Sequence, residues 1–234
     1  MSRTRNQNNL KPALKTLIVI VGPTASGKTA LAIELAGKLN TEIISADSRQ
    51  FFKEIPIGTA APTEEQLNEV PHHFIGNLAI SDNYNVSQFE KDVLELLDDK
   101  WKAHDQMIMV GGSGLYVNAV CKGIDKLPDV DEDLRINLNE LYKKDGIKAL
   151  QFKLKELDPE YYKIVDVNNP KSLLRSIEFC MQTGKTFTSL RKNKPKARDF
   201  LIIKIGLETD RDKLNERINK RADEMMKSGW MEEA

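Results

Sequence analysis

The stretch LIVIVGPTASGKTALAIELAGKL, residues 17–39, decides the fold of this chain. Its leading apolar residues predict a buried strand, GPTASGKT predicts a turn, and the apolar residues that follow at helical spacing predict a helix. The glycine spacing before Lys28 and Thr29 is typical of a loop whose backbone N–H groups hold a phosphate, while the lysine adds charge and the hydroxyl ligates Mg²⁺. A glycine turn that only links strand to helix is the alternative, and the flanking strand and helix favour the phosphate site.

A second GKT, residues 184–186, is not predicted to be another phosphate loop. Phe179 stands where the first glycine is needed, and the preceding LLRSIEFCMQ has a helical pattern instead of a strand pattern. We expect Gly184 to end that helix, because glycine readily adopts the left-handed conformation at this position.

Composition restricts the class of protein. The 234 residues are 40% apolar and 30% charged, which is ordinary for a globular chain. No apolar run approaches the roughly 18 residues that span a membrane, so we expect a cytoplasmic protein without a membrane partner. Equal numbers of basic and acidic residues, 35 each, argue against indiscriminate binding to nucleic acid.

The charges are unevenly distributed along the chain. One segment has nine basic residues against Glu178 and Asp199: Lys171, Arg175, Lys185, Arg191, Lys192, Lys194, Lys196, Arg198 and Lys204. This excess predicts either a surface for a phosphate backbone or a solvated loop, and charge alone does not choose between them.

The order of the expected elements indicates an α/β fold. Strand patterns cover residues 17–21, 42–45, 107–110 and 200–207, and helical patterns cover 28–39, 87–103 and 115–120. Such alternation predicts a parallel sheet with crossover helices. Because residues 131–184 have only helical patterns, we predict a phosphate-loop core interrupted by a helical insertion. The predicted parts are residues 15–123 and 199–234 for the core and 124–198 for the insertion.

Two polar positions follow the predicted strands. Ligands of parallel sheets bind beyond the carboxyl ends of the strands, where Asp47 stands in IISADSRQ and Ser113 in MIMVGGSGLY. Asp47 has three possible roles: a base, a ligand of Mg²⁺ or water, or a helix cap. We favour the base, because a carboxylate beside a bound diphosphate is a poor phosphate contact. The adjacent His72 and His73 are a weaker candidate for a polar site.

Several motifs together resemble one enzyme family. They are GPTASGKT, IISADSRQFFKEIPIGTAAPT, VPHHFIG, YNVSQFEKD and MVGGSGLY. The combination is similar to the tRNA dimethylallyltransferases, also called tRNA isopentenyltransferases. The resemblance runs from about residue 15 to the last residue and includes NNPKSLLRSIEFCMQTGKTFTSL in the insertion. Members of that family continue beyond SGWMEEA, so the resemblance implies a chain truncated at its C-terminus.

This resemblance implies prenyl transfer to tRNA. The loop would hold dimethylallyl diphosphate, whose dimethylallyl group passes to N6 of the adenosine on the 3′ side of the anticodon, and pyrophosphate leaves. Asp47 matches the base, Thr24 the residue near the bridging oxygen, and Lys28 a charge donor. We expect Arg217 to contact the diphosphate, with Arg221 as the alternative. We expect the Thr29 hydroxyl to ligate Mg²⁺. The expected diphosphate or nucleotide site is Gly22, Pro23, Thr24, Ala25, Ser26, Gly27, Lys28 and Thr29.

The tRNA, which accepts the dimethylallyl group, must be bound firmly by the protein, because the target adenine has to leave the stack of the anticodon loop to reach the pocket. The resemblance assigns the following residues to tRNA: Asp47, Ser48, Arg49, Gln50, Ser113, Arg135, Lys171, Ser172, Leu173, Leu174 and Arg175. Ser113 replaces the threonine often found there and keeps the hydroxyl. We expect a monomer that binds the anticodon stem-loop. The competing classes are a phosphate-loop kinase that transfers phosphate from ATP to a small molecule, and an RNA-binding module regulated by its phosphate site.

Overall fold

The computed structural model describes residues 14–125, 128, 131–190 and 195–234. Two compact units share the chain. The core unit contains the described residues up to Gly123 together with Lys196–Ala234, and the insertion unit contains those of Ile124–Pro195.

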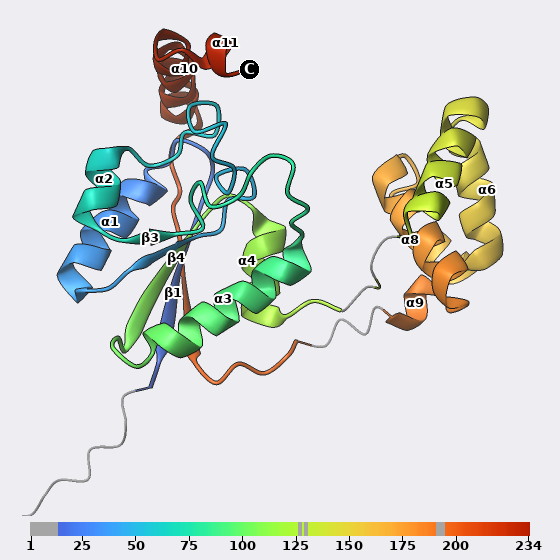
Figure 1. The fold of residues 1–234 in the computed structure, drawn as a ribbon, viewed down its shortest axis with the longest axis horizontal. Coiled ribbons are helices and arrows are strands. Elements are labelled where there is room, and N and C mark those ends of the chain that lie inside the picture. The colour runs from blue at the N-terminus through green and yellow to red at the C-terminus, as the bar shows by residue number, and fades with distance from the viewer. Residues whose placement is uncertain (1–13, 126–127, 129–130, 191–194) are drawn as a thin grey trace, which may run out of the picture. The chain divides into compact units, whose positions relative to one another are not determined.

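A parallel sheet forms the centre of the core unit (Figure 1). Among the described residues its strand order is β3-β2-β4-β1-β5, and each neighbouring pair runs parallel. The strands are β1 (Thr16–Val21), β2 (Ile43–Ser45), β3 (His72–His73), β4 (Gln106–Val110) and β5 (Leu201–Gly206). The predicted α/β class with a parallel sheet is confirmed, whereas the pattern of the sequence does not indicate the two-residue strand β3.

Helices cover both faces of this sheet. The helices of the core unit are α1 (Lys28–Leu39), α2 (Glu64–Glu69), α3 (Val86–Lys100), α4 (Gly114–Lys122), α10 (Arg211–Lys227) and α11 (Trp230–Glu233). Met107 and Met109 of β4 pack into a cluster with α3 and α4, whereas Ile108 and Val110 pack with α1. The alternation of side chains along a strand therefore gives each face its own apolar core. Helix α3 ends at Lys100, earlier than predicted, and the chain continues into a turn.

The insertion unit is helical, as its sequence pattern predicts. Its helices are α5 (Glu132–Asp145), α6 (Ile147–Leu157), α7 (Pro159–Tyr162), α8 (Pro170–Thr183) and α9 (Phe187–Leu190). Leu138, Leu150, Leu154 and Ile177 are buried in its apolar cluster. Gly184 ends α8 with φ 67°, and its N–H donates to the carbonyl of Cys180 at 2.9 Å. The prediction that the second GKT ends a helix is therefore confirmed.

The chain re-enters the core unit through Lys196 and Arg198. The N–H of Lys196 donates to the carbonyl of Lys122 at 2.8 Å, and Arg198 Nη2 pairs with the buried carboxylate of Glu90 at 2.7 Å. Arg198 Nε also donates to the carbonyl of Val120, at the end of α4. The structure therefore groups residues 196–198 with the core, whereas the sequence pattern groups them with the insertion.

Helix α10 differs from the other long helices because none of its described residues is buried. Its sequence has the expected apolar positions, but Leu214 and Met225 are only half-buried and Ile218 is 36% exposed. Within the described part of the chain, every helix is too short or too polar to cross a bilayer.

Candidate active site

The loop between β1 and α1 has the backbone geometry of an anion-binding turn. Gly22, Ala25 and Gly27 have φ values of 155°, 61° and 92°. A Cβ on Gly22 would lie 2.8 Å from the carbonyl oxygen of Leu207, so a larger residue does not fit there. Helix α1 begins after Gly27 without a side-chain cap and without acidic residues in its first turn. Its first N–H groups and its positive dipole end are therefore directed at whatever occupies the loop.

Two side chains of this loop fit a phosphorylated ligand. Lys28 Nζ donates to the carbonyl of Pro23 at 2.6 Å, which keeps the ammonium group over the loop. The Oγ atom of Ser26 is buried and has no hydrogen-bond partner among the described residues. A buried hydroxyl without a partner is costly, so a ligand oxygen at this position would stabilise the loop. The exposed Thr24 and half-buried Thr29 lie on either side of these groups in the chain.

The charges around Lys28 point to one of the two candidate arginines. Burial lowers the pKa of Lys28 below its ordinary value, the positive charge of Arg221 lowers it further, and the carboxylate of Asp47 opposes both effects. Arg221 and Asp47 are therefore both near the ammonium group. Arg217, one helical turn before Arg221, makes no comparable contribution. The electrostatic effect on Lys28 thus favours Arg221, which the sequence offered as the alternative.

Asp47 lies in a tight turn after β2. Its Oδ1 atom accepts the N–H of Arg49 at 3.1 Å, and its carbonyl accepts the N–H of Gln50 at 3.2 Å. This turn is not followed by a helix, so Asp47 is not a helix cap. The Oδ2 atom faces Gly112, where a Cβ would lie 3.9 Å from it. One carboxylate oxygen therefore shapes the turn while the other faces the glycine-rich loop after β4.

This glycine-rich loop is fastened to the Asp47 turn. Ser113 Oγ accepts the N–H of Ser48 at 3.0 Å and donates to Ser48 Oγ at 3.1 Å. A Cβ on Gly111 would lie 2.2 Å from the carbonyl oxygen of Ala46, so only glycine permits this approach. The Ser113 hydroxyl, which the resemblance assigns to a contact with tRNA, thus hydrogen-bonds to Ser48 and positions the neighbouring turn.

The side-chain amide of Gln50 likewise makes its hydrogen bonds within the protein. Its Oε1 accepts from Ser45 Oγ at 3.0 Å, and its Nε2 donates to the carbonyls of Thr59 and Ala60 at 3.3 and 3.1 Å. These bonds hold residues 55–60 against the Asp47 turn. Arg49, in contrast, is exposed and directed to solvent.

The arginines predicted for tRNA in the insertion unit share a buried carboxylate. Arg135 binds Glu178 through two nitrogen atoms, with Nη2 at 2.7 Å from Oε2, and Arg175 lies 3.5 Å from the same carboxylate. Arg175 also donates to the carbonyl of Pro128 at 3.1 Å. Glu178 is 2% exposed, whereas the side chains of Arg135 and Arg175 are 39% and 28% exposed. Both arginines therefore keep an outward edge, but their positions depend on Glu178, which the sequence analysis missed.

The remaining residues predicted for tRNA on α8 differ in exposure. Lys171 is exposed, and Ser172 and Leu174 are half-buried. Leu173 is fully buried in the apolar cluster of the insertion, so its side chain has a packing role, and the prediction that it contacts RNA remains a prediction. Lys185 is exposed, whereas Lys196 and Arg198 pair with Glu90. Arg191, Lys192 and Lys194 lie outside the described residues.

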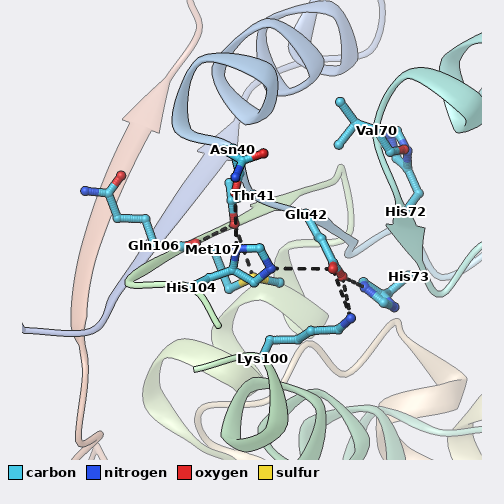
Figure 2. A network of polar contacts seen from close by, with 10 residues as sticks. All are labelled: Asn40, Thr41, Glu42, Val70, His72, His73, Lys100, His104, Gln106 and Met107. Carbon is cyan, nitrogen blue, oxygen red and sulfur yellow. Dashed lines mark hydrogen bonds and ion pairs between the residues drawn. The ribbon is translucent and has the colours of Figure 1, made fainter. Parts of the chain in front are cut away.

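The histidines lie in a polar network at the opposite end of the sheet, where the strands begin (Figure 2). Glu42, just before β2, accepts from Lys100 Nζ at 2.7 Å and from His73 Nε2 at 2.5 Å, and His104 Nε2 lies 3.5 Å from it. His72 bonds to the carbonyl of Val70 at 2.7 Å. Because Glu42 precedes β2 and Asp47 follows it, this network lies at the amino ends of the strands, away from the phosphate loop. The histidine pair therefore has a structural position and is not part of the candidate active site.

The fold and this site define a class, the α/β proteins with a phosphate-loop type of core and a helical insertion. A family model described as IPP transferase matches residues 50–234. The chain is 50% identical to tRNA dimethylallyltransferase 1 of Phocaeicola vulgatus, over 94% of this chain and 73% of that protein. It is 51% identical to the tRNA dimethylallyltransferase of Christiangramia forsetii, over 93% of this chain and 72% of that protein. The chain belongs to the IPP transferase family, to which the tRNA dimethylallyltransferases belong.

Solved structures agree with this assignment. The tRNA isopentenylpyrophosphate transferase of Bacillus halodurans is similar over 94% of this chain and 68% of that one, with a TM-score of 0.62 and 35% identity. A eukaryotic dimethylallyltransferase acting on tRNA is similar over 94% of this chain and 55% of that one, with a TM-score of 0.76 and 25% identity.

Proposed function

We propose that this chain transfers the dimethylallyl group of dimethylallyl diphosphate to N6 of the adenosine on the 3′ side of the anticodon in tRNA. The observation that carries the proposal is the 50% identity to a relative named tRNA dimethylallyltransferase over nearly the whole chain. The convergence of Lys28, Arg221 and Asp47 at one phosphate loop supports it.

In the proposed reaction, N6 of the adenine forms a bond to C1 of the dimethylallyl group while the bond from C1 to the bridging oxygen breaks. The electron pair of the broken bond leaves with pyrophosphate, and the N6 proton passes to Asp47. Exocyclic N6 is a weak nucleophile because its lone pair is delocalised into the ring, so proton removal by a carboxylate assists the step. Thr24, on the exposed side of the loop, contacts the bridging oxygen in this proposal.

The positive groups of the site neutralise the departing pyrophosphate. Lys28, the N–H groups at the start of α1 and Arg221 supply this charge, and they act where the charge increases during bond breakage. Mg²⁺ bound at the Thr29 hydroxyl would add a further positive charge to the diphosphate. The buried Ser26 hydroxyl and the uncapped α1 terminus fit such a ligand.

On the acceptor side, Asp47 to Gln50 form the turn that receives the adenine, and Arg49 is free to contact the neighbouring nucleotides. We propose that the exposed Lys171 and the outward edges of Arg135 and Arg175 contact phosphates of the anticodon stem. The reaction takes place in the cytoplasm, where its tRNA substrate is found.

The test is incubation of the protein with tRNA, Mg²⁺ and dimethylallyl diphosphate labelled in the dimethylallyl group. We expect label in the RNA, release of pyrophosphate and no requirement for ATP. A tRNA whose target adenosine is replaced by guanosine is the matched control and should remain unlabelled. Strict dependence on ATP with release of ADP would instead identify a kinase, and binding of tRNA without turnover would identify an RNA-binding module.

A further inference from the structure

Helix α10, which carries Arg221, is held beside the phosphate loop at its first end. The N–H of Leu207 donates to the carbonyl of Val21 at 2.8 Å, and the Leu207 carbonyl lies against Gly22. Asp210 then caps the helix by accepting the N–H groups of Asp212 and Lys213. The start of α10 is therefore fixed to the end of β1, and α10 extends beyond the carboxyl end of β5 (Figure 1).

The far end of α10 is held by the short helix α11. Both carboxylate oxygens of Glu233 accept backbone N–H groups of the loop after the Asp47 turn: Oε2 accepts from Ile57 at 2.7 Å and Oε1 from Gly58 at 2.6 Å. A Cβ on Gly58 would lie 2.5 Å from Trp230 Nε1, so the indole of α11 packs directly on this loop. A carboxylate that accepts two N–H groups forms stronger bonds than a neutral acceptor.

The loop that receives Glu233 is held by several hydrogen bonds of its own. The Thr59 hydroxyl donates to the carbonyl of Ile55 at 2.8 Å, the N–H of Ala60 donates to Ile57 at 2.8 Å, and Gln50 bonds to the carbonyls of residues 59 and 60. Between its two ends, α10 buries none of its described residues. Its position is therefore determined by its ends more than by packing along its length.

We propose that Glu233 is a positioning residue, whose bonds to the Ile57 and Gly58 amides hold α10 so that Arg221 reaches the diphosphate. The proposal rests on the proposed function, because it assigns the diphosphate to Arg221. The positive charge of Arg221 lowers the pKa of Lys28 in the phosphate loop, which supports the proposal. Both carboxylate oxygens of Glu233 are used by the Ile57 and Gly58 amides, so in this proposal its effect on the ligand passes through Arg221.

The experiment compares Glu233→Gln with Glu232→Gln, a matched control at the exposed neighbouring residue. Glutamine keeps one acceptor oxygen but loses the charge and the second acceptor. We expect Glu233→Gln to weaken the binding of inorganic pyrophosphate, measured by calorimetry with Mg²⁺, by about tenfold, or about 1.4 kcal/mol. The control and the affinity for tRNA should not change, and the melting temperature of each variant checks the fold.

A double-mutant cycle separates positioning from general stability. In an Arg221→Ala background, Glu233→Gln should cause no further loss of pyrophosphate affinity, because the residue through which it acts is gone. Unchanged affinity in the single variant, or additive losses in the double variant, would overturn the proposal while leaving the proposed function intact. Failure of the wild-type protein to bind pyrophosphate would overturn the proposed function and this inference together.

Discussion

Replacement of Asp47 by asparagine tests proton transfer with little change of shape. The Asn Oδ1 atom can still accept the N–H of Arg49, and the turn bond from Gln50 uses the backbone carbonyl of residue 47. The residue is half-buried and lies outside the apolar clusters. We therefore expect the free energy of unfolding to change by less than about 1 kcal/mol.

The expected effect on the chemical step is much larger. Loss of a general base typically lowers a rate by about 10² to 10⁴, which corresponds to about 2.7 to 5.4 kcal/mol of transition-state stabilisation. Binding should respond differently, because the Asp47 carboxylate offsets part of the positive potential at Lys28. Its removal leaves a more positive phosphate loop, so dimethylallyl diphosphate should bind Asp47→Asn at least as tightly as it binds the wild-type protein.

Single-turnover transfer at saturating tRNA and donor is the decisive assay, since saturation removes binding from the comparison. A donor titration at several Mg²⁺ concentrations accompanies it. Prenyl transfer by Asp47→Asn at nearly the wild-type rate would refute the assignment of the base. Weaker, Mg²⁺-dependent donor binding would instead identify Asp47 as a ligand of the metal.

Three further predictions concern other parts of the chain. Lys28→Ala should lower single-turnover transfer by roughly 10²-fold or more, because a charge donor to the leaving group is lost, and a rate within threefold of wild type would exclude that role. Lys171→Ala should reduce the salt slope of tRNA affinity by about one unit without changing donor affinity, whereas Lys163→Ala, which removes a lysine paired with Glu160 at 2.6 Å, should leave the slope unchanged. Burial raises the pKa of Glu42, but hydrogen bonds from Lys100 and His73 outweigh it and the net shift is downward. Its stabilising contribution is therefore present above the unfolded-state pKa, near 4.3, and lost as the pH falls through the folded-state pKa. Glu42→Gln should lower the free energy of unfolding by about 1–3 kcal/mol at pH 7 and by less at pH 4, which urea titrations at both pH values measure; equal losses would contradict the argument.

The sequence by itself determined the features that depend on short stretches of chain. The glycine spacing before Lys28 predicts a phosphate loop, because the causes are local. Steric limits on φ decide which residues fit the turn, and the free N–H groups belong to the helical turn that follows directly. The continuous apolar run of β4 indicates a strand buried on both faces, and Gly184 indicates a helix end for the same local reason. The family resemblance rests on several such short motifs taken together, and the match to the family model agrees with it.

Only the tertiary structure decided which side chains meet. Arg217 and Arg221 are one turn apart on the same helix, so periodicity does not distinguish them, and the choice depends on where the two ends of α10 are fastened. Glu233 and Ile57 are separated by 176 positions, and Glu178 and Arg135 by 43. Leu173 is fully buried, whereas Lys171, two residues before it on α8, is exposed. These outcomes depend on contacts between distant segments, whose formation is governed by the packing of whole elements and leaves no pattern within any short stretch of the sequence.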